Sequence, residues 1–224
     1  MITVSMWQCP LDLIERALIE HPIEGSRTAL NRANGNFFYD PWVIKDEFKG
    51  TVWEEVLDTI PYSIGEARVI TLQPGTTYQA HADIDDRWHL NLQSEESYLI
   101  NLTDNEMFKL RVDTHWRHMD ASKIHSATNF GSIPRIQLVV RKTLTKSKYT
   151  KLTAVKIEPA GEQASFRYKF DNLVSPWLNL QNKECTLSDF DYNGTCVTFK
   201  LATHKLDELA ELLTVDYKLT IDAS

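Results

Sequence analysis

ARVITL at residues 67–72 opens the part of the chain that decides the fold. Polar and apolar residues alternate in several short segments from here to residue 142, and Gly, Pro, Asn, Asp and Ser separate them. The later segments are HLNL at 89–92, SYLINL at 97–102, MFKLRV at 107–112, THWRHM at 114–119 and RIQLVVR at 135–141. Short strands at this spacing are typical of an antiparallel sandwich or barrel. We therefore expect a mainly β core over residues 66–142.

Three side chains inside this core have the composition of an iron site. His81 and Asp83 are two residues apart, so on an extended strand they would point to the same face. His125 would complete a set of two imidazoles and one carboxylate. Such a set occupies one face of a metal ion and leaves the opposite positions open, as in non-haem Fe(II) oxygenases. The sequence therefore predicts His81, Asp83 and His125 as metal ligands and catalytic residues.

The order of residues around this trio resembles the aspartyl/asparaginyl β-hydroxylase family of Fe(II)- and 2-oxoglutarate-dependent oxygenases, which includes related bacterial proline hydroxylases. In that family the first histidine follows a Pro-Gly turn by six residues, as His81 follows Gly75. An arginine stands ten residues beyond the distal histidine, as Arg135 stands beyond His125. The resemblance covers roughly residues 65–142.

The resemblance implies a double-stranded β-helix, the jelly-roll or cupin-like barrel of these enzymes, with N-terminal helices bracing its outer sheet. It also implies Fe(II), 2-oxoglutarate as co-substrate and O₂. The reaction would hydroxylate a C–H bond of an amino acid, free or in a peptide, and release succinate and CO₂. Arg135 would bind the far carboxylate of 2-oxoglutarate, a role that suits a permanently charged, bidentate guanidinium.

Other positions match the family less closely. Arg87 and His89 correspond to an Arg-x-His pair of the co-substrate pocket, although the pair comes three residues sooner after the first histidine. Asp83 stands where the vertebrate-type β-hydroxylases have glycine, so this chain is more similar to the bacterial free-amino-acid hydroxylases with a complete triad. A serine that touches the co-substrate in the β-hydroxylases falls on Ile70.

The periodicity outside the core divides the chain. We predict an oxygenase domain over residues 1–145, with helical support in 1–65 and the core in 66–142, and a small α+β accessory module over 150–224. A basic run between residues 141 and 151 marks the boundary. The remaining elements predicted are helices at 10–21, 51–60 and 203–214, a strand or aromatic plug at 37–43, and strands at 153–157, 165–170, 195–201 and 217–221. Dimerisation and covering the barrel mouth are the accessory roles expected of the C-terminal module.

Composition limits the partners. The net charge is −7 and the isoelectric point about 5.5, so we expect no nucleic acid as partner. Three cysteines fit neither a zinc ribbon nor a disulfide framework, and no signal peptide or membrane-spanning run is visible. A cytoplasmic enzyme acting on a small molecule or a peptide is the expectation.

Several residues and two other functions stay open at this stage. Arg117 is our candidate for binding the substrate carboxylate, with Arg68 and Arg141 as alternatives. His115 and His118 are expected at the surface or behind the site, because neither has an arginine ten residues further on. The same barrel could also serve a non-oxidative cupin-type metalloprotein using Zn or Mn, or a catalytically silent binding protein.

Overall fold

The protein is described here from a computed structural model, which covers residues 2–161, 174–213 and 217–222. The chain forms two compact units. The first contains residues 1–80 and 86–143, and the second contains residues 144–224 together with the short segment 81–85.

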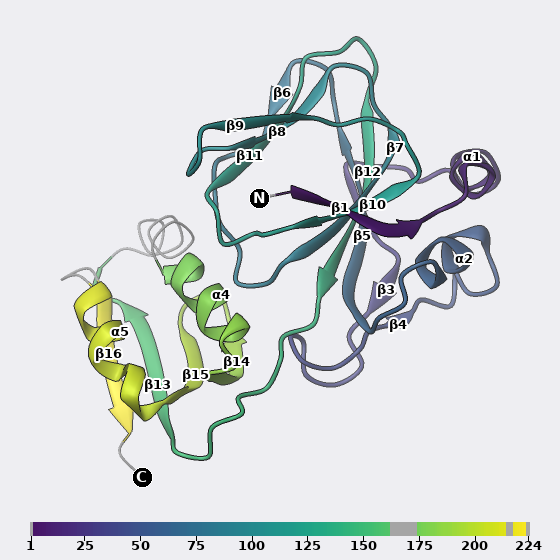
Figure 1. Cartoon of the computed structure of the whole chain (residues 1–224). Helices are drawn as coiled ribbons and strands as arrows, with labels where there is room; N and C mark the ends of the chain where they lie inside the picture. Colours follow the sequence, from purple (N-terminus) through teal and green to yellow (C-terminus); the bar gives the residue numbers. More distant parts are fainter. Residues whose placement is uncertain (1, 162–173, 214–216, 223–224) are drawn as a thin grey trace. The chain divides into compact units, whose positions relative to one another are not determined.

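Two antiparallel sheets make up the core of the first unit (Figure 1). Their strand orders are β1-β10-β7-β12-β5-β2 and β6-β11-β8-β9. From β5 to β12 the chain passes repeatedly between the two sheets, which is the strand order of a jelly roll and makes the fold double-stranded-β-helix-like. The strands of the larger sheet are β1 (Ile2–Gln8), β2 (Arg27–Ala29), β5 (Ile64–Leu72), β7 (Arg87–Gln93), β10 (His115–Met119) and β12 (Arg135–Lys142). Those of the smaller sheet are β6 (Thr76–Thr77), β8 (Ser97–Asn101), β9 (Glu106–Lys109) and β11 (His125–Asn129).

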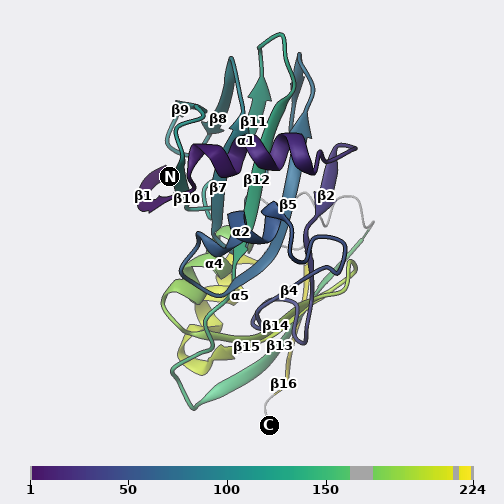
Figure 2. The same cartoon turned by 90° about the vertical axis from the view of Figure 1, so that its right-hand side faces the viewer.

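Helices α1 (Leu11–Glu20) and α2 (Val52–Asp58) cover one face of the larger sheet (Figure 2). The residues buried there include Trp53 of α2, Trp116 of β10 and Leu138 of β12. Trp116 Nε1 also donates a hydrogen bond of 2.8 Å to Thr59 Oγ1 at the end of α2. A short hairpin of β3 (Asn31–Arg32) and β4 (Val43–Ile44) completes this side.

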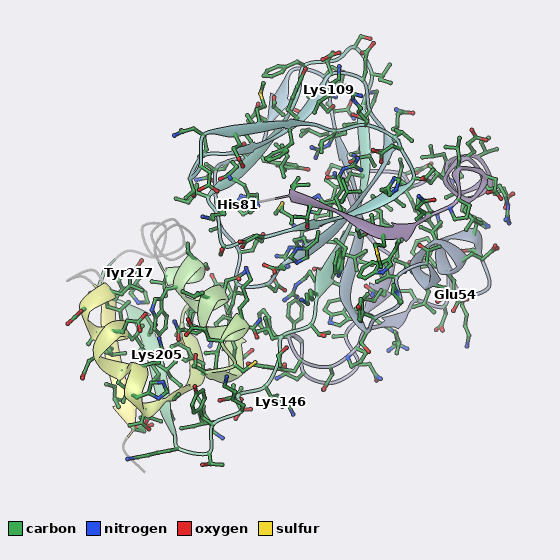
Figure 3. All side chains as sticks on the ribbon, viewed as in Figure 1. Glu54, His81, Lys109, Lys146, Lys205 and Tyr217 are labelled. Carbon is green, nitrogen blue, oxygen red and sulfur yellow. The ribbon has the colours of Figure 1, made fainter. Side chains whose placement is uncertain are left out.

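The opposite face of the larger sheet looks into the barrel. Side chains from both sheets fill this interior (Figure 3). Met119 of β10 packs there against Leu99 of β8 and Ala127 of β11. Polar residues also face this interior: the inward residues of β12 and β7 pair as Gln137 with Asn91 and as Arg141 with Arg87, with Val139 opposite His89 between them.

The second unit has a sheet of its own in the order β14-β15-β13-β16. Its elements are β13 (Leu152–Pro159), α4 (Ser175–Lys183), β14 (Leu187–Tyr192), β15 (Val197–Ala202), η2 (Thr203–Lys205), α5 (Leu206–Leu212) and β16 (Tyr217–Asp222). Leu178 of α4, Phe199 of β15 and Leu209 of α5 are among its buried residues.

The structure corrects several expectations about elements. His81 and Asp83 do not lie on an extended strand: His81 forms a single β-bridge, and Asp83 lies in an irregular segment. Of the two alternatives for residues 37–43, the strand is wrong for 37–39: they form a turn in which Asn36 Oδ1 accepts hydrogen bonds from the backbone N–H groups of Phe38 and Tyr39. The side chains of Phe38 and Tyr39 are buried, as an aromatic plug would be. Strands β1, β11 and β14 and helix α4 were not predicted. The strand expected at 165–170 lies outside the described residues, and no described helix has the length and hydropathy to cross a membrane.

Candidate metal and co-substrate site

The three predicted metal ligands lie together. One ligand atom from each of His81, Asp83 and His125 lies within 4.8 Å of the others. His81 Nε2 and Asp83 Oδ2 are 3.8 Å apart. Figure 3 labels His81, which precedes β7 by six residues, and His125 is the first residue of β11. A trio of two imidazoles and a carboxylate is therefore present.

Neighbouring groups orient these ligands. His125 Nδ1 lies 2.8 Å from the backbone carbonyl oxygen of Lys123. A carbonyl oxygen only accepts, so Nδ1 carries the proton and Nε2 keeps the lone pair that a metal needs. In the second unit, Asn179 Nδ2 of α4 donates a 3.1 Å hydrogen bond to the carbonyl of Asp83. This bond holds the backbone of a ligand that has no strand to support it.

The donor set suits a divalent transition metal. Imidazole nitrogen with one carboxylate fits Fe(II), and also Mn or Zn. His125 is buried, whereas His81 and Asp83 are half-buried, with side-chain exposures of 38% and 25%. The ligand set thus combines one enclosed group with two that solvent reaches, so a small molecule could reach a bound ion.

Arg135 stands at the start of β12 and points into the barrel of the first unit. The residue is only 1% exposed. Its Nε and Nη1 atoms are enclosed and have no hydrogen-bond partner among the described residues. Burial lowers the pKa of the guanidinium to about 10, and the nearby Tyr78 offsets a little of this shift. A buried cation without an anion is costly, so this group has the character of an anion site.

His89 lies further along the same interior face. It is only 5% exposed, and burial, together with the electrostatic influence of His125, Arg135 and Arg87, lowers its pKa to about 3. The imidazole is therefore neutral at physiological pH. Gln137 Nε2 donates a 2.6 Å hydrogen bond to Asn91 Oδ1, and these two residues carry the polar lining from His89 towards Arg135.

The other arginines of the interior have partners. Arg87 is 7% exposed and lies opposite Arg141 where β7 pairs with β12. The side chains of both arginines take part in interactions within the protein. The guanidinium of Arg141 lies 4.4 Å from the ring centroid of Phe37. Arg117 donates to an Asp113 carboxylate oxygen and, over 3.3 Å, to the carbonyl of His115. Two nitrogens of the predicted substrate-binding arginine are thus already engaged. Arg68 forms a 3.2 Å ion pair with Glu66.

The structure also identifies positioning residues that the sequence did not single out. Asn129, 0% exposed at the end of β11, donates to the carbonyls of Leu72 and Ile133 and accepts from Ser97 Oγ and the Gly131 N–H. It thereby ties the end of β5 to the turn that leads into Arg135. No local sequence signal could have found it, because its partners are up to 57 residues away.

Two aspartates close to Asp83 are buried, with exposures of 1% for Asp85 and 7% for Asp86. Asp86 accepts a 3.3 Å hydrogen bond from the backbone N–H of Ala121 and lies 3.0 Å from His118 Nε2. His118 is therefore held behind the site by a carboxylate. His115 lies 2.8 Å from the Gln8 amide at the outer edge of the sheet.

Comparisons with known proteins give little that bears on this site. No family model and no curated protein matches the sequence. Among solved structures, AviO1 from Streptomyces viridochromogenes Tue57 is similar with a TM-score of 0.39 and 8% identity, over 62% of this chain and 88% of that one. A Pseudomonas putida prolyl-4-hydroxylase is similar with a TM-score of 0.36 and 14% identity, over 62% and 90%. Both TM-scores are below 0.5, so neither likeness decides fold or function.

A cavity of about 260 Å³ lies elsewhere in the first unit, between α2 and the β3–β4 hairpin. Trp42, Leu57 and Tyr62 are among the residues that line it. None of the candidate site residues does, so this cavity is separate from the chemistry described above.

Proposed function

We propose that this protein is an Fe(II)- and 2-oxoglutarate-dependent dioxygenase that hydroxylates a C–H bond of an amino acid, free or in a peptide. The observation that carries the proposal is Arg135, a buried guanidinium with two partnerless nitrogens in a barrel that also supplies His125. A metal site alone fits many reactions. A metal trio together with an internal anion site fits a co-substrate that has a chelating end and a second carboxylate.

Each residue has a distinct task in this proposal. His81, Asp83 and His125 hold the metal on one side and leave its other positions to the co-substrate and O₂. When bound, the iron would bring together O₂, which is the oxidant, and 2-oxoglutarate, which would be oxidised to succinate and CO₂ while the second oxygen atom goes to the substrate C–H bond. Arg135 neutralises the far carboxylate and fixes the direction in which the co-substrate lies.

The neutral His89 completes the co-substrate pocket. An imidazolium beside Arg135 would add a second buried cation, and the low pKa prevents this. The neutral ring can donate one hydrogen bond to the co-substrate. Arg87, two residues before His89 on the same strand, contributes to the same pocket. Arg117 stays our candidate for the substrate carboxylate: two of its five N–H groups are engaged by Asp113 and His115, which leaves three for a ligand.

The proposal is tested by binding and turnover in matched variants. We expect Asp83→Ala and His125→Ala to weaken Mn(II), used as a non-oxidising stand-in for Fe(II), by at least about tenfold, since each removes one of three ligands. Both should abolish succinate release from the Fe(II) enzyme. His115→Ala is the control: it changes an imidazole on a nearby strand and should leave metal affinity intact.

Two results would count against the proposal. Unchanged Mn(II) affinity in the ligand variants would remove the metal site. Normal metal binding without any affinity for 2-oxoglutarate would favour a non-oxidative metalloprotein on the same barrel.

A further inference from the structure

An asparagine is buried on the inner face of helix α4, in the second unit. Asn179 is only 1% exposed, and Leu178 beside it is also buried, whereas Leu180 is exposed. Asparagine has a low helix propensity, and its amide gains nothing from apolar surroundings, so an apolar side chain would be more stable at this position. A buried amide of this kind needs a specific partner.

That partner is the backbone of a predicted metal ligand. Asn179 Nδ2 donates a 3.1 Å hydrogen bond to the carbonyl oxygen of Asp83, a residue 96 positions away in the sequence. Both residues belong to the second unit, because segment 81–85 groups with the C-terminal part of the chain. Ala82 and Ile84, on either side of Asp83, are buried, whereas the side chain of Asp83 itself is 25% exposed. The segment is therefore enclosed while its carboxylate remains accessible.

The hydrogen bond acts on a ligand whose backbone needs support. Asp83 lies in an irregular segment, so no strand ladder fixes its peptide groups. A bond to its carbonyl oxygen restricts rotation about the Cα–C bond, and with it the directions in which the carboxylate can point. Groups that orient a metal ligand in this way typically contribute about ten- to a hundredfold to metal affinity.

We propose that Asn179 is a positioning residue for Asp83, so that helix α4 of the second unit takes part in metal binding. This inference rests on the proposed function, because it assumes that Asp83 is a metal ligand, but it requires no particular co-substrate. Coupling between two sites is reciprocal. A metal ion bound by Asp83 therefore also stabilises α4 against local opening.

Two asparagines of α4 allow a matched test. Asn179→Leu removes the amide that bonds to Asp83 and keeps a side chain of similar size. Asn182→Leu removes an amide on the same helix, whose Oδ1 accepts a 2.9 Å hydrogen bond from the backbone N–H of Thr145. Thr145 lies outside segment 81–85, so this variant measures the effect of losing a helix amide alone.

The first measurement is calorimetric titration of the full-length, metal-free proteins with Mn(II). We expect Asn179→Leu to bind Mn(II) about ten- to a hundredfold more weakly than the parent protein, and Asn182→Leu to bind it equally well. The second measurement is hydrogen exchange of the α4 amides, residues 175–183, with and without saturating Mn(II). Mn(II) should slow this exchange in the parent protein and in Asn182→Leu, and leave it unchanged in Asn179→Leu.

The outcomes separate the two proposals. If the parent protein binds Mn(II) through Asp83 and Asn179→Leu binds it equally well, the role of Asn179 is wrong while the proposed function stands. Equal weakening in Asn179→Leu and Asn182→Leu would also overturn this role, since destabilisation of the second unit would explain both. So would α4 exchange that Mn(II) does not slow in the parent protein. A parent protein whose Mn(II) affinity does not depend on Asp83 would overturn the proposed function and the role of Asn179 with it.

Discussion

Arg135 keeps a positive charge inside the barrel, where its desolvation opposes folding. Nothing in the described structure neutralises it: Nε and Nη1 have no partner, and the nearest aromatic ring is that of Tyr78. A residue held at such a cost is typical of a binding site, where a ligand supplies the missing charge.

This cost can be measured with Arg135→Met. Without co-substrate, we expect the free energy of unfolding of the variant to be about 1 to 3 kcal/mol larger than that of the parent protein. The variant is more stable because an apolar side chain replaces a buried, unpaired cation. It should lose the stabilisation that 2-oxoglutarate gives. Urea unfolding of the metal-loaded protein, with and without 2-oxoglutarate, measures both effects.

Arg141→Met is the control for this experiment. It removes a guanidinium that lies against Phe37 and Phe38, so it should lower stability. An Arg135→Met variant that is likewise less stable would show that the Arg135 charge is compensated within the protein.

His89 predicts how stability depends on pH. Its pKa is about 3 in the folded protein against an ordinary 6.5, so between these values the unfolded chain binds a proton that the folded protein does not. The contribution of His89 to stability is therefore lost as the pH falls, by about 1.4 kcal/mol per pH unit below 6.5.

The comparison is with His89→Gln, which has no titrating group at this position. The free energy of unfolding, measured with urea between about pH 7 and pH 5, should change less steeply with pH in the variant. At the acidic end, the difference between the two slopes should correspond to about one bound proton. Equal slopes in the two proteins would mean that His89 is protonated in the folded state.

At the scale of residues, the sequence correctly predicted which three side chains lie together. The spacing of His81, Asp83 and His125 identified a trio that the structure brings together. The spacing of Arg135 from His125 singled out a residue that proves to be buried without a charged partner. Burial and the lack of a partner depend on long-range packing, so they could not be predicted from the residues alone.

Among the elements, β11 and the turn after it organise the end of the barrel where Arg135 lies. Asn129 connects this turn to β5 and β8 through four hydrogen bonds. Arg135 follows the turn directly, so the turn fixes the backbone position of this residue.

Asn129→Ala should therefore act on both stability and binding. The change removes the amide that donates to the carbonyls of Leu72, where the bond is buried, and Ile133, where it is partly buried, and we expect it to lower the free energy of unfolding by about 1 to 3 kcal/mol. The 2-oxoglutarate affinity of the molecules that remain folded should fall, whereas Mn(II) affinity should not.

Asn129→Asp keeps the acceptor oxygen and is the matched variant, since only the bonds to Leu72 and Ile133 are lost. Full 2-oxoglutarate affinity in Asn129→Ala would show that the turn does not position Arg135.

Elements were harder to predict than ligands, for physical reasons. All five residues of β11 are buried, so the strand has no alternation of exposed and buried residues to recognise. By contrast, β7 was predicted from the alternation of HLNL at 89–92, although nearly all of its residues are buried. Strand β1 exists through pairing with β10, more than a hundred residues later.

On the scale of the whole molecule, the charge distribution is the main feature. The chain carries a net charge of −7, yet Arg87, Arg117, Arg135 and Arg141 are all less than 10% exposed. Three of these four arginines have interactions within the protein, so Arg135 is the one for which we propose an anionic ligand. The sequence could not predict that segment 81–85 belongs with the second unit, because this depends on long-range contacts such as that of Asn179 with Asp83.

The most direct test of the central claim is an anaerobic titration of the Fe(II)-loaded protein with 2-oxoglutarate, followed through the visible charge-transfer absorption of a metal-chelated 2-oxo acid. We expect the band to appear in the parent protein, to be absent in Asp83→Ala and His125→Ala, and to require much more 2-oxoglutarate in Arg135→Met. A parent protein that binds Fe(II) and shows no band at any concentration of 2-oxoglutarate would contradict the assignment.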